Sequence, residues 1–94
     1  MIIRIVKMTF KPDLAKDFLN LFNENKNHIA GFEGCTHLEL LNDRDNPATF
    51  FTYSKWENEH FLEKYRNSEL FNTVWDQTKK LFDAKPEAWT VTKM

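Results

Sequence analysis

Residues 50–61 (FFTYSKWENEHF), near the middle of the chain, mark where a strand ends and a helix begins. Up to Trp56, aromatic residues alternate with threonine, serine and lysine, which is the period of a half-buried strand. Beyond Trp56 the apolar positions include Phe61 and Tyr65, which have the spacing of a helix. Asn58 can cap that helix by accepting a hydrogen bond from a free backbone N–H. The sequence therefore predicts a corner at Trp56, where a sheet meets a helix.

The residues before this corner predict a strand, a helix and then a hairpin of two strands. Residues 2–10 are rich in Ile, Val, Met and Phe, which indicates a strand. Apolar residues at helical spacing predict a helix that begins near Pro12 and ends at Gly31. Residues 35–42 and 48–56 alternate as strands do, and the turn formers between them predict an antiparallel hairpin.

Two helices and a last strand are expected after the corner. The first helix is short and runs to about Arg66, and Ser68 can cap a longer helix whose apolar stripe continues to Phe82. Pro86 ends the helical run, because proline lacks the backbone N–H that a helix interior needs. Residues 88–94 then indicate a final strand.

This order of elements predicts an α+β chain, a single domain over residues 1–94 with the ferredoxin-like split βαβ arrangement. In that fold a four-stranded antiparallel sheet carries its helices on one face and leaves the other face bare. Ile3 and Ile5 belong to the bare face, and a soluble protein must cover such apolar side chains. The simplest closure is a twofold dimer through the sheets. We therefore expect a homodimer with Ile3 and Ile5 in its interface.

The charges along the chain are nearly balanced, with 13 basic and 14 acidic residues and a net charge of −1. No basic cluster suggests nucleic acid or an anionic membrane as a partner. No apolar run approaches the roughly 20 residues that cross a bilayer, and Arg4 and Lys7 interrupt the first apolar segment. We expect a cytoplasmic protein that binds neither nucleic acid nor membrane.

The histidine and cysteine residues do not predict a metal site. His37 and Glu39 share one face of the second strand, and Glu57 and His60 lie three apart on a helix, but no further ligands follow at a related spacing. Cys35, expected on the His37 face, is the only cysteine and is typical of a small buried residue. Neither glycine opens a helix as a phosphate-binding loop does. We therefore expect no metal and no nucleotide cofactor.

Aromatic residues make up 15% of the chain and are the remaining functional signal. They include Trp56, Tyr65 and Trp75, each on or beside a predicted helix. Two interpretations remain open: these side chains fill the core between helices and sheet, or they line a pocket there. A buried phenol or indole N–H needs a hydrogen-bond partner, which a ligand or a water in a cavity can provide.

The run FFTYSKWENEHFLEKYRNSELF, the first strand, the turn GFEGC and the closing strand together resemble the antibiotic biosynthesis monooxygenase family across nearly the whole chain. The tryptophan-to-helix corner is the most recognisable part. The resemblance implies a dimeric α+β barrel of two ferredoxin-like subunits, each with a pocket between sheet and helices. It also implies oxygenation of an electron-rich aromatic or quinol-like substrate without metal or flavin, in which the deprotonated substrate itself reduces dioxygen.

The chain departs from two branches of this family at the positions that carry chemistry. Haem-degrading members have an asparagine on the first strand and a tryptophan and a histidine on the helices. By spacing from Trp56, these positions resemble Val6, Tyr65 and Trp75 here, so haem degradation is not expected. Quinol-oxidising relatives often carry a histidine where Tyr65 stands. A phenol, with an ordinary pKa of about 10, suits a hydrogen-bond donor to a substrate oxygen better than a base.

Two functions therefore remain. The first is a cofactor-independent monooxygenase of a small or polycyclic aromatic substrate, with Tyr65 and His60 as catalytic candidates and Arg4 as a further polar partner. The expected pocket residues are Val6, Trp56, Tyr65, Phe71 and Trp75. The second is a non-catalytic homodimer that binds a small apolar ligand or serves as a structural module, and the absence of a convincing base favours it.

Overall fold

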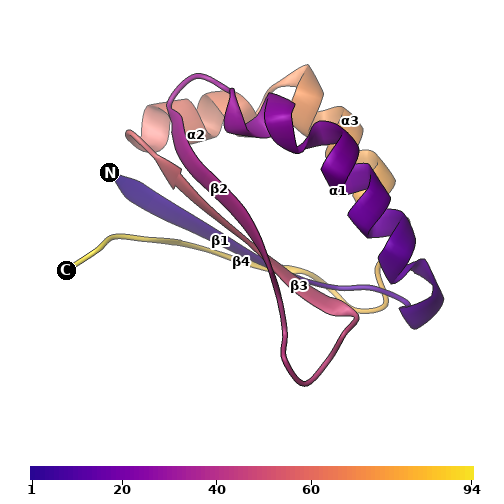
Figure 1. Cartoon of the computed structure of the whole chain (residues 1–94). Helices are drawn as coiled ribbons and strands as arrows, with labels where there is room; N and C mark the ends of the chain where they lie inside the picture. The colour runs from indigo at the N-terminus through magenta and orange to yellow at the C-terminus, as the bar shows by residue number, and fades with distance from the viewer.

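The computed structural model describes residues 1–94 and contains one antiparallel sheet with all its helices on one side (Figure 1). The elements in chain order are β1 (Ile2–Thr9), the 3₁₀ helix η1 (Pro12–Leu14), α1 (Ala15–Ala30), β2 (Cys35–Asn42), β3 (Thr49–Trp56), α2 (Glu59–Arg66), α3 (Glu69–Lys79) and β4 (Glu87–Val91). This is the ferredoxin-like α+β fold that the sequence predicts. No helix combines the length and the apolar character that crossing a membrane requires.

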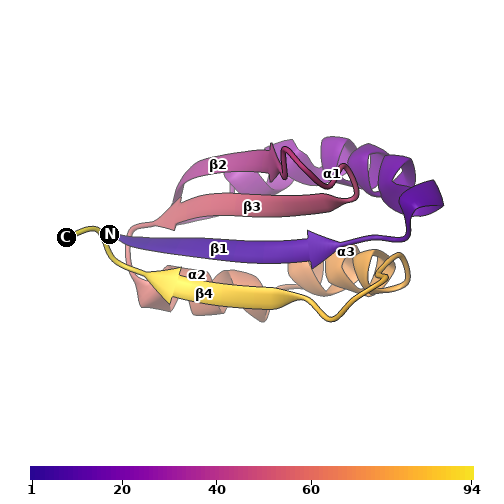
Figure 2. The same cartoon turned by 90° about the horizontal axis from the view of Figure 1, so that it is seen from below.

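The four strands lie in the order β2-β3-β1-β4, and every neighbouring pair is antiparallel. Figure 2 shows this order directly, with β1 and β3 at the centre and the helices behind the sheet. The first and last strands pair although they are far apart in the sequence. This pairing places residues near the two chain ends side by side, among them Arg4 and Thr90.

The register decides which residues face the helices. Val6 and Met8 face them together with their β3 partners, and Met8 is 3% exposed. Ile3 and Ile5 alternate with these residues and lie on the opposite side, beside Trp89 and Val91 of β4. Nothing within the chain covers that side, and Trp89 remains 43% exposed.

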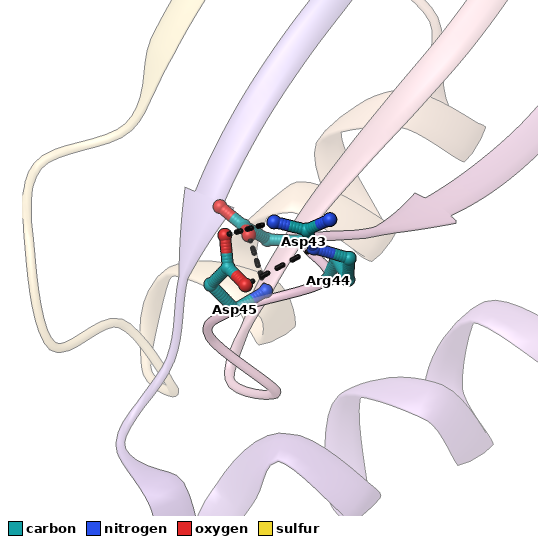
Figure 3. A network of polar contacts seen from close by, with 3 residues as sticks. All are labelled: Asp43, Arg44 and Asp45. Atoms are coloured by element: carbon teal, nitrogen blue, oxygen red, sulfur yellow. Dashed lines mark hydrogen bonds and ion pairs between the residues drawn. The ribbon is translucent and has the colours of Figure 1, made fainter.

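The β2–β3 hairpin forms where the turn residues predict it. In its loop Asp43 accepts a hydrogen bond from the backbone N–H of Asp45 at 2.9 Å, and Arg44 donates to the Asp45 carboxylate at 3.1 Å (Figure 3). The Arg44 side chain is 91% exposed. The loop is therefore held by its own polar groups, at the surface.

One end of the layer between helices and sheet is closely packed. Met8, Phe10, Phe18, Phe22 and Phe50 form a buried cluster, and Phe10 is fully buried. The rings of Phe10 and Phe18 stack with centroids 4.2 Å apart. This cluster holds α1 against the sheet, because α1 supplies Phe18 and Phe22, β1 and β3 supply Met8 and Phe50, and Phe10 directly follows β1.

Two element boundaries differ from the sequence prediction. The last helix ends at Lys79, and Phe82 lies beyond it, where its backbone pairs with Phe10. Phe82 still packs in the core, with its ring 5.3 Å from that of Phe10. The segment after α3 also packs against the core, so its apolar residues extended the apparent helical pattern beyond the true end of the helix. The last strand is also shorter than residues 88–94, ending at Val91.

The face of Cys35 was predicted wrongly. The ladder between β2 and β3 shifts between Cys35 and His37, which pair with Trp56 and Lys55 respectively. This irregularity puts Cys35 on the helix-facing side, away from His37. Strict alternation could not show the shift, because an extra residue in one strand reverses the faces beyond it.

The turn before β2 depends on Gly34 rather than on the glycine that ends α1. Gly31 follows the last residue of α1 with ordinary right-handed backbone angles, whereas Gly34 has a φ of 85°. A Cβ at Gly34 would also lie 2.3 Å from the Cβ of Phe61. Only glycine fits here, and the close approach brings this turn against the start of α2.

Candidate functional site

A cavity of about 350 Å³ lies between the sheet and the helices, next to the closely packed cluster. It is bordered mainly by hydrophobic side chains from β1, β3, α1, α2 and α3, and by residues at the start of β4. The five residues expected from the sequence to line a pocket, Val6, Trp56, Tyr65, Phe71 and Trp75, all border it. Its volume lies in the range of small-molecule sites, although at the lower end.

Trp56 forms a fixed wall of the cavity. The residue ends β3 and is 1% exposed, and its indole N–H donates to the Ser54 hydroxyl at 3.0 Å. Ser54 in turn lies 3.4 Å from the backbone oxygen of Arg4. The partner that a buried indole requires is therefore a residue of the same strand. Because its hydrogen bond is already made and Tyr65 stacks on its ring, Trp56 is a structural part of the wall with almost no surface free for a ligand.

Tyr65, on α2, is surrounded by aromatic side chains. Its ring stacks on Trp56 with centroids 5.0 Å apart, and it meets Phe32 and Phe71 edge-on, each at 5.3 Å. The Tyr65 hydroxyl forms no hydrogen bond with any other residue, yet it is not sealed from solvent. It is therefore free to bond a ligand in the cavity.

The phenol of Tyr65 is held in its protonated form. Burial, with a smaller contribution from the nearby Cys35, raises the pKa of Tyr65 to about 12. Burial also raises the pKa of the Cys35 thiol, with an opposing effect from its hydrogen bond to the His37 backbone. At neutral pH Tyr65 can therefore donate a hydrogen bond, but it cannot accept a proton as a base.

Helix α3 supplies the wall opposite the sheet. Ser68 caps this helix by accepting a hydrogen bond from the Phe71 N–H at 3.1 Å. Phe71 and Trp75, one helical turn apart, have nearly parallel rings with centroids 5.8 Å apart. Trp75 also meets Phe82 edge-on at 5.6 Å, which joins the cavity wall to the closely packed cluster.

Two arginines border the cavity. Arg4, on the helix-facing side of β1, donates to the Thr90 hydroxyl of β4 at 2.9 Å and is half-buried. Arg66, the last residue of α2, pairs with Glu63 at 3.1 Å. The sequence identified Arg4 as a polar partner and missed Arg66. A basic residue in the last turn of a helix is common, and only the folded chain brings it to β1.

The structure places His60 outside this site. The side chain is exposed at the start of α2, its ring lies edge-on to Phe61, and it does not border the cavity. His37 lies on the other side of the sheet, 3.3 Å from Glu39. No three histidine, cysteine or acidic side chains gather in a group that could hold a metal ion.

The fold and the cavity define a class: a ferredoxin-like α+β domain with an aromatic-lined pocket between its sheet and its helices. The sequence pattern of the antibiotic biosynthesis monooxygenase family matches residues 1–76. The chain belongs to this family. No curated protein matches the sequence.

Solved structures share the fold along the full length of the chain. The crystal structure of an antibiotic biosynthesis monooxygenase superposes with a TM-score of 0.93 at 17% identity, covering 100% of this chain and 99% of the other. A conserved protein from Methanosarcina mazei Go1 gives 0.92 at 23% identity, covering 100% and 94%. Rv0793 from Mycobacterium tuberculosis gives 0.90 at 14% identity, covering 99% and 94%. At these identities the likeness is one of fold.

Proposed function

We propose that the protein is a cofactor-independent monooxygenase that oxidises a small aromatic, quinol-like substrate in the cavity. The observation that carries this proposal is an apolar cavity whose wall presents the unpartnered hydroxyl of Tyr65. The partly exposed aromatic rings of Tyr65 and Trp75 suit a flat substrate ring. Membership of the antibiotic biosynthesis monooxygenase family supports the same reaction class.

The chemistry draws its electrons from the substrate. A hydroxylated arene loses its phenolic proton, and the anion passes one electron to dioxygen. The two radicals join at a ring carbon, and a proton converts the adduct to a hydroperoxide. Loss of water then leaves a quinone, with one oxygen atom of dioxygen in the product and the other in water. The protein's contribution is to bind the ring, exclude water and stabilise negative charge on the substrate oxygen.

In this proposal Tyr65 donates a hydrogen bond to the substrate oxygen as charge develops there. A phenol whose pKa is about 12 keeps its proton throughout the working pH range. Such a donor is present before the reaction begins and needs no reorganisation. His60 has no part in this scheme, because it does not border the cavity.

The test compares oxygen consumption by wild type and Tyr65→Phe with a panel of quinols and hydroxylated polycyclic aromatics, with a metal chelator present. Losing a transition-state donor should lower turnover about tenfold or more. Losing a merely packed hydroxyl should cost on the order of 1 kcal/mol in stability and leave turnover alone. If Tyr65→Phe consumes oxygen as fast as wild type, the catalytic role of Tyr65 is wrong.

A second candidate, a non-catalytic ligand-binding module, is favoured by one observation. None of the groups in the cavity wall is a histidine, and its phenol has a raised pKa, so no evident base removes the substrate proton. The same oxygen assay separates the two candidates. If no member of the panel is consumed above the rate of spontaneous autoxidation, ligand binding becomes the better description.

The homodimer is part of the same proposal. The apolar outer side of the sheet carries Ile3 and Ile5 and is uncovered within the chain, with Trp89 and Val91 at 43% and 40% exposed. A second sheet packed on it would remove this surface from water. Figure 2 views the sheet from this open side.

Light scattering coupled to size exclusion tests the dimer. Wild type should elute at twice the 11.3 kDa chain mass at micromolar concentration. Ile5→Asp should dissociate or unfold it, because an unpaired charge in the interface costs several kcal/mol. Lys16→Asp is the control, since Lys16 is exposed on the outside of α1. A monodisperse wild-type monomer would show that the sheets do not pair.

A further inference from the structure

We infer that the cavity takes an aromatic anion and that the guanidinium of Arg4 binds the ligand's charged oxygen. The inference rests on the proposed function, because it names the chemical class that the same cavity accepts. The charged oxygen would belong to a carboxylate or to a phenolate on the ring. Either presents the same chemistry to a guanidinium, namely an anionic oxygen that accepts its N–H donors.

The position of Arg4 is unusual for a residue with no charged partner. It borders the cavity from the helix-facing side of β1, half-buried, between β3 and β4. Its side chain makes one hydrogen bond, through Nη1 to the neutral Thr90 hydroxyl. None of the five ion pairs in the protein includes Arg4. Several N–H donors of its guanidinium therefore remain for another acceptor.

The charges around Arg4 leave this part of the cavity positive. Burial lowers the pKa of Arg4, the neighbouring Arg66 lowers it further, and Glu63 opposes them. Glu63 is already paired with Arg66 at 3.1 Å. Two guanidinium groups thus share one carboxylate. A cation in such surroundings is stabilised when an anion binds beside it.

Glu87 is the only acidic residue that borders the cavity. In the ladder it pairs with Lys7, whose side chain alternates to the side opposite Val6 and Met8. That register directs the Glu87 side chain to the outer side of the sheet, with Ile3 and Ile5. Glu87 is also exposed, so it does not neutralise Arg4.

The position of Arg4 also fits the aromatic wall. The Ser54 hydroxyl joins the Arg4 backbone to the Trp56 indole, through distances of 3.4 Å and 3.0 Å. Tyr65, which stacks on Trp56, directly precedes Arg66 on α2. A ligand whose charged oxygen meets Arg4 can therefore lay its ring against Tyr65 or Trp75, which border the cavity and are only partly buried.

The experiment is a binding titration by calorimetry, with three naphthalene probes that share one ring system. 2-Naphthoate carries a carboxylate, 2-naphthol carries a phenol, and 2-naphthalenemethanol is neutral. Wild type should bind naphthoate about tenfold or more tightly than the neutral alcohol, as expected for a charge-assisted hydrogen bond. Arg4→Gln should remove this preference while leaving affinity for the neutral alcohol within about twofold.

Arg44→Gln is the matched control, because it makes the same change on an exposed hairpin loop outside the cavity. It should bind all three probes as wild type does. Arg4→Lys keeps the charge and should retain part of the preference, and thermal melts confirm that each variant is folded. If Arg4→Gln does not fold, the test uses Arg4→Lys and Arg66→Gln. Each must weaken the binding of naphthoate more than the binding of the neutral alcohol.

The naphthol titration, followed by absorbance against pH, separates the two anions. If Arg4 binds a phenolate, bound naphthol should ionise at a lower pH in wild type than in Arg4→Gln. A naphthoate preference without that shift assigns the carboxylate. Equal affinity of wild type for naphthoate and the neutral alcohol, or no naphthoate binding at all, overturns the inference. Because these readouts need no turnover, they can fail while oxygen is consumed, or succeed while it is not.

Discussion

The layer between helices and sheet has two ends that use the same kind of residue differently. At the α1 end, the rings of Phe18 and Phe50 pack against Phe10, which has no exposed surface. At the α2 and α3 end, Tyr65 and Trp75 are half-buried and leave a cavity of about 350 Å³. Aromatic residues therefore fill one half of this layer and line the other half.

The difference follows from which residues also carry a polar group. The closely packed cluster consists of phenylalanines and a methionine, which need no hydrogen-bond partner. The cavity end holds two tryptophans, a tyrosine and two arginines, whose polar atoms require an acceptor or water. The sequence left two roles open for the aromatic residues, filling the core or lining a pocket. The structure shows both roles, one at each end of the layer.

The largest expected effect contrasts the two ends directly. Phe10→Ala should lower the free energy of unfolding by about 3–5 kcal/mol, because it leaves a void in a fully buried cluster. Phe71→Ala, at the already open end, should cost no more than about half as much. Urea unfolding of both variants measures the difference. Equal costs would show that the cavity end is packed as tightly as the other.

The second prediction concerns pH. The pKa of Tyr65 is about 12 in the folded chain against an ordinary 10, so the unfolded phenol ionises first. The protonated phenol therefore contributes its full stabilisation of the folded chain below pH 10, and this contribution is lost as the pH rises towards 12. Wild type should lose about 2–3 kcal/mol over that window relative to Tyr65→Phe. If the free energies of unfolding of wild type and Tyr65→Phe change equally from pH 9 to 12, the phenol of Tyr65 is not buried as described.

A smaller effect is expected from the acceptor behind the cavity wall. Ser54→Ala leaves the buried indole N–H of Trp56 without a partner, which should cost about 1–2 kcal/mol in unfolding free energy. Ser54→Thr keeps a hydroxyl at this position and is the control. Near-ultraviolet circular dichroism reports whether the Trp56 environment persists. If Ser54→Ala leaves the free energy of unfolding unchanged, water must reach the indole N–H of Trp56.

The smallest effect is expected from haem. By their spacing from Trp56, Val6 and Trp75 resemble the positions where the haem-degrading branch has its amide and its imidazole, and no histidine borders the cavity as a proximal ligand for iron. Mixed with haem and a reductant, the protein should leave the Soret band without saturable change. Loose binding through exposed His28 or His60 is distinguished by a titration. A 1:1 complex that bleaches to an open tetrapyrrole would make this prediction wrong.

The sequence predicts the order of elements because its local signals agree with the fold. Period-two alternation ends at Trp56, and Asn58 and Ser68 cap α2 and α3 through the bonds expected of them. Alternating residues also separate Val6 and Met8 from Ile3 and Ile5 on β1. These features depend on residues close in the chain, where side-chain period and capping chemistry are readable.

The tertiary structure decided what depends on distant contacts. A shift in the ladder moved Cys35 to the helix-facing side beside Tyr65, and a one-residue irregularity leaves no mark in the alternation around it. Burial beyond the end of α3 carried the apolar stripe to Phe82. The proximity of Arg4 and Arg66 required α2 to lie over the sheet, so that residues far apart in the sequence interact. Whether aromatic residues enclose space or fill it is likewise fixed only when elements far apart in sequence come into contact, because packing is a property of their joint volume.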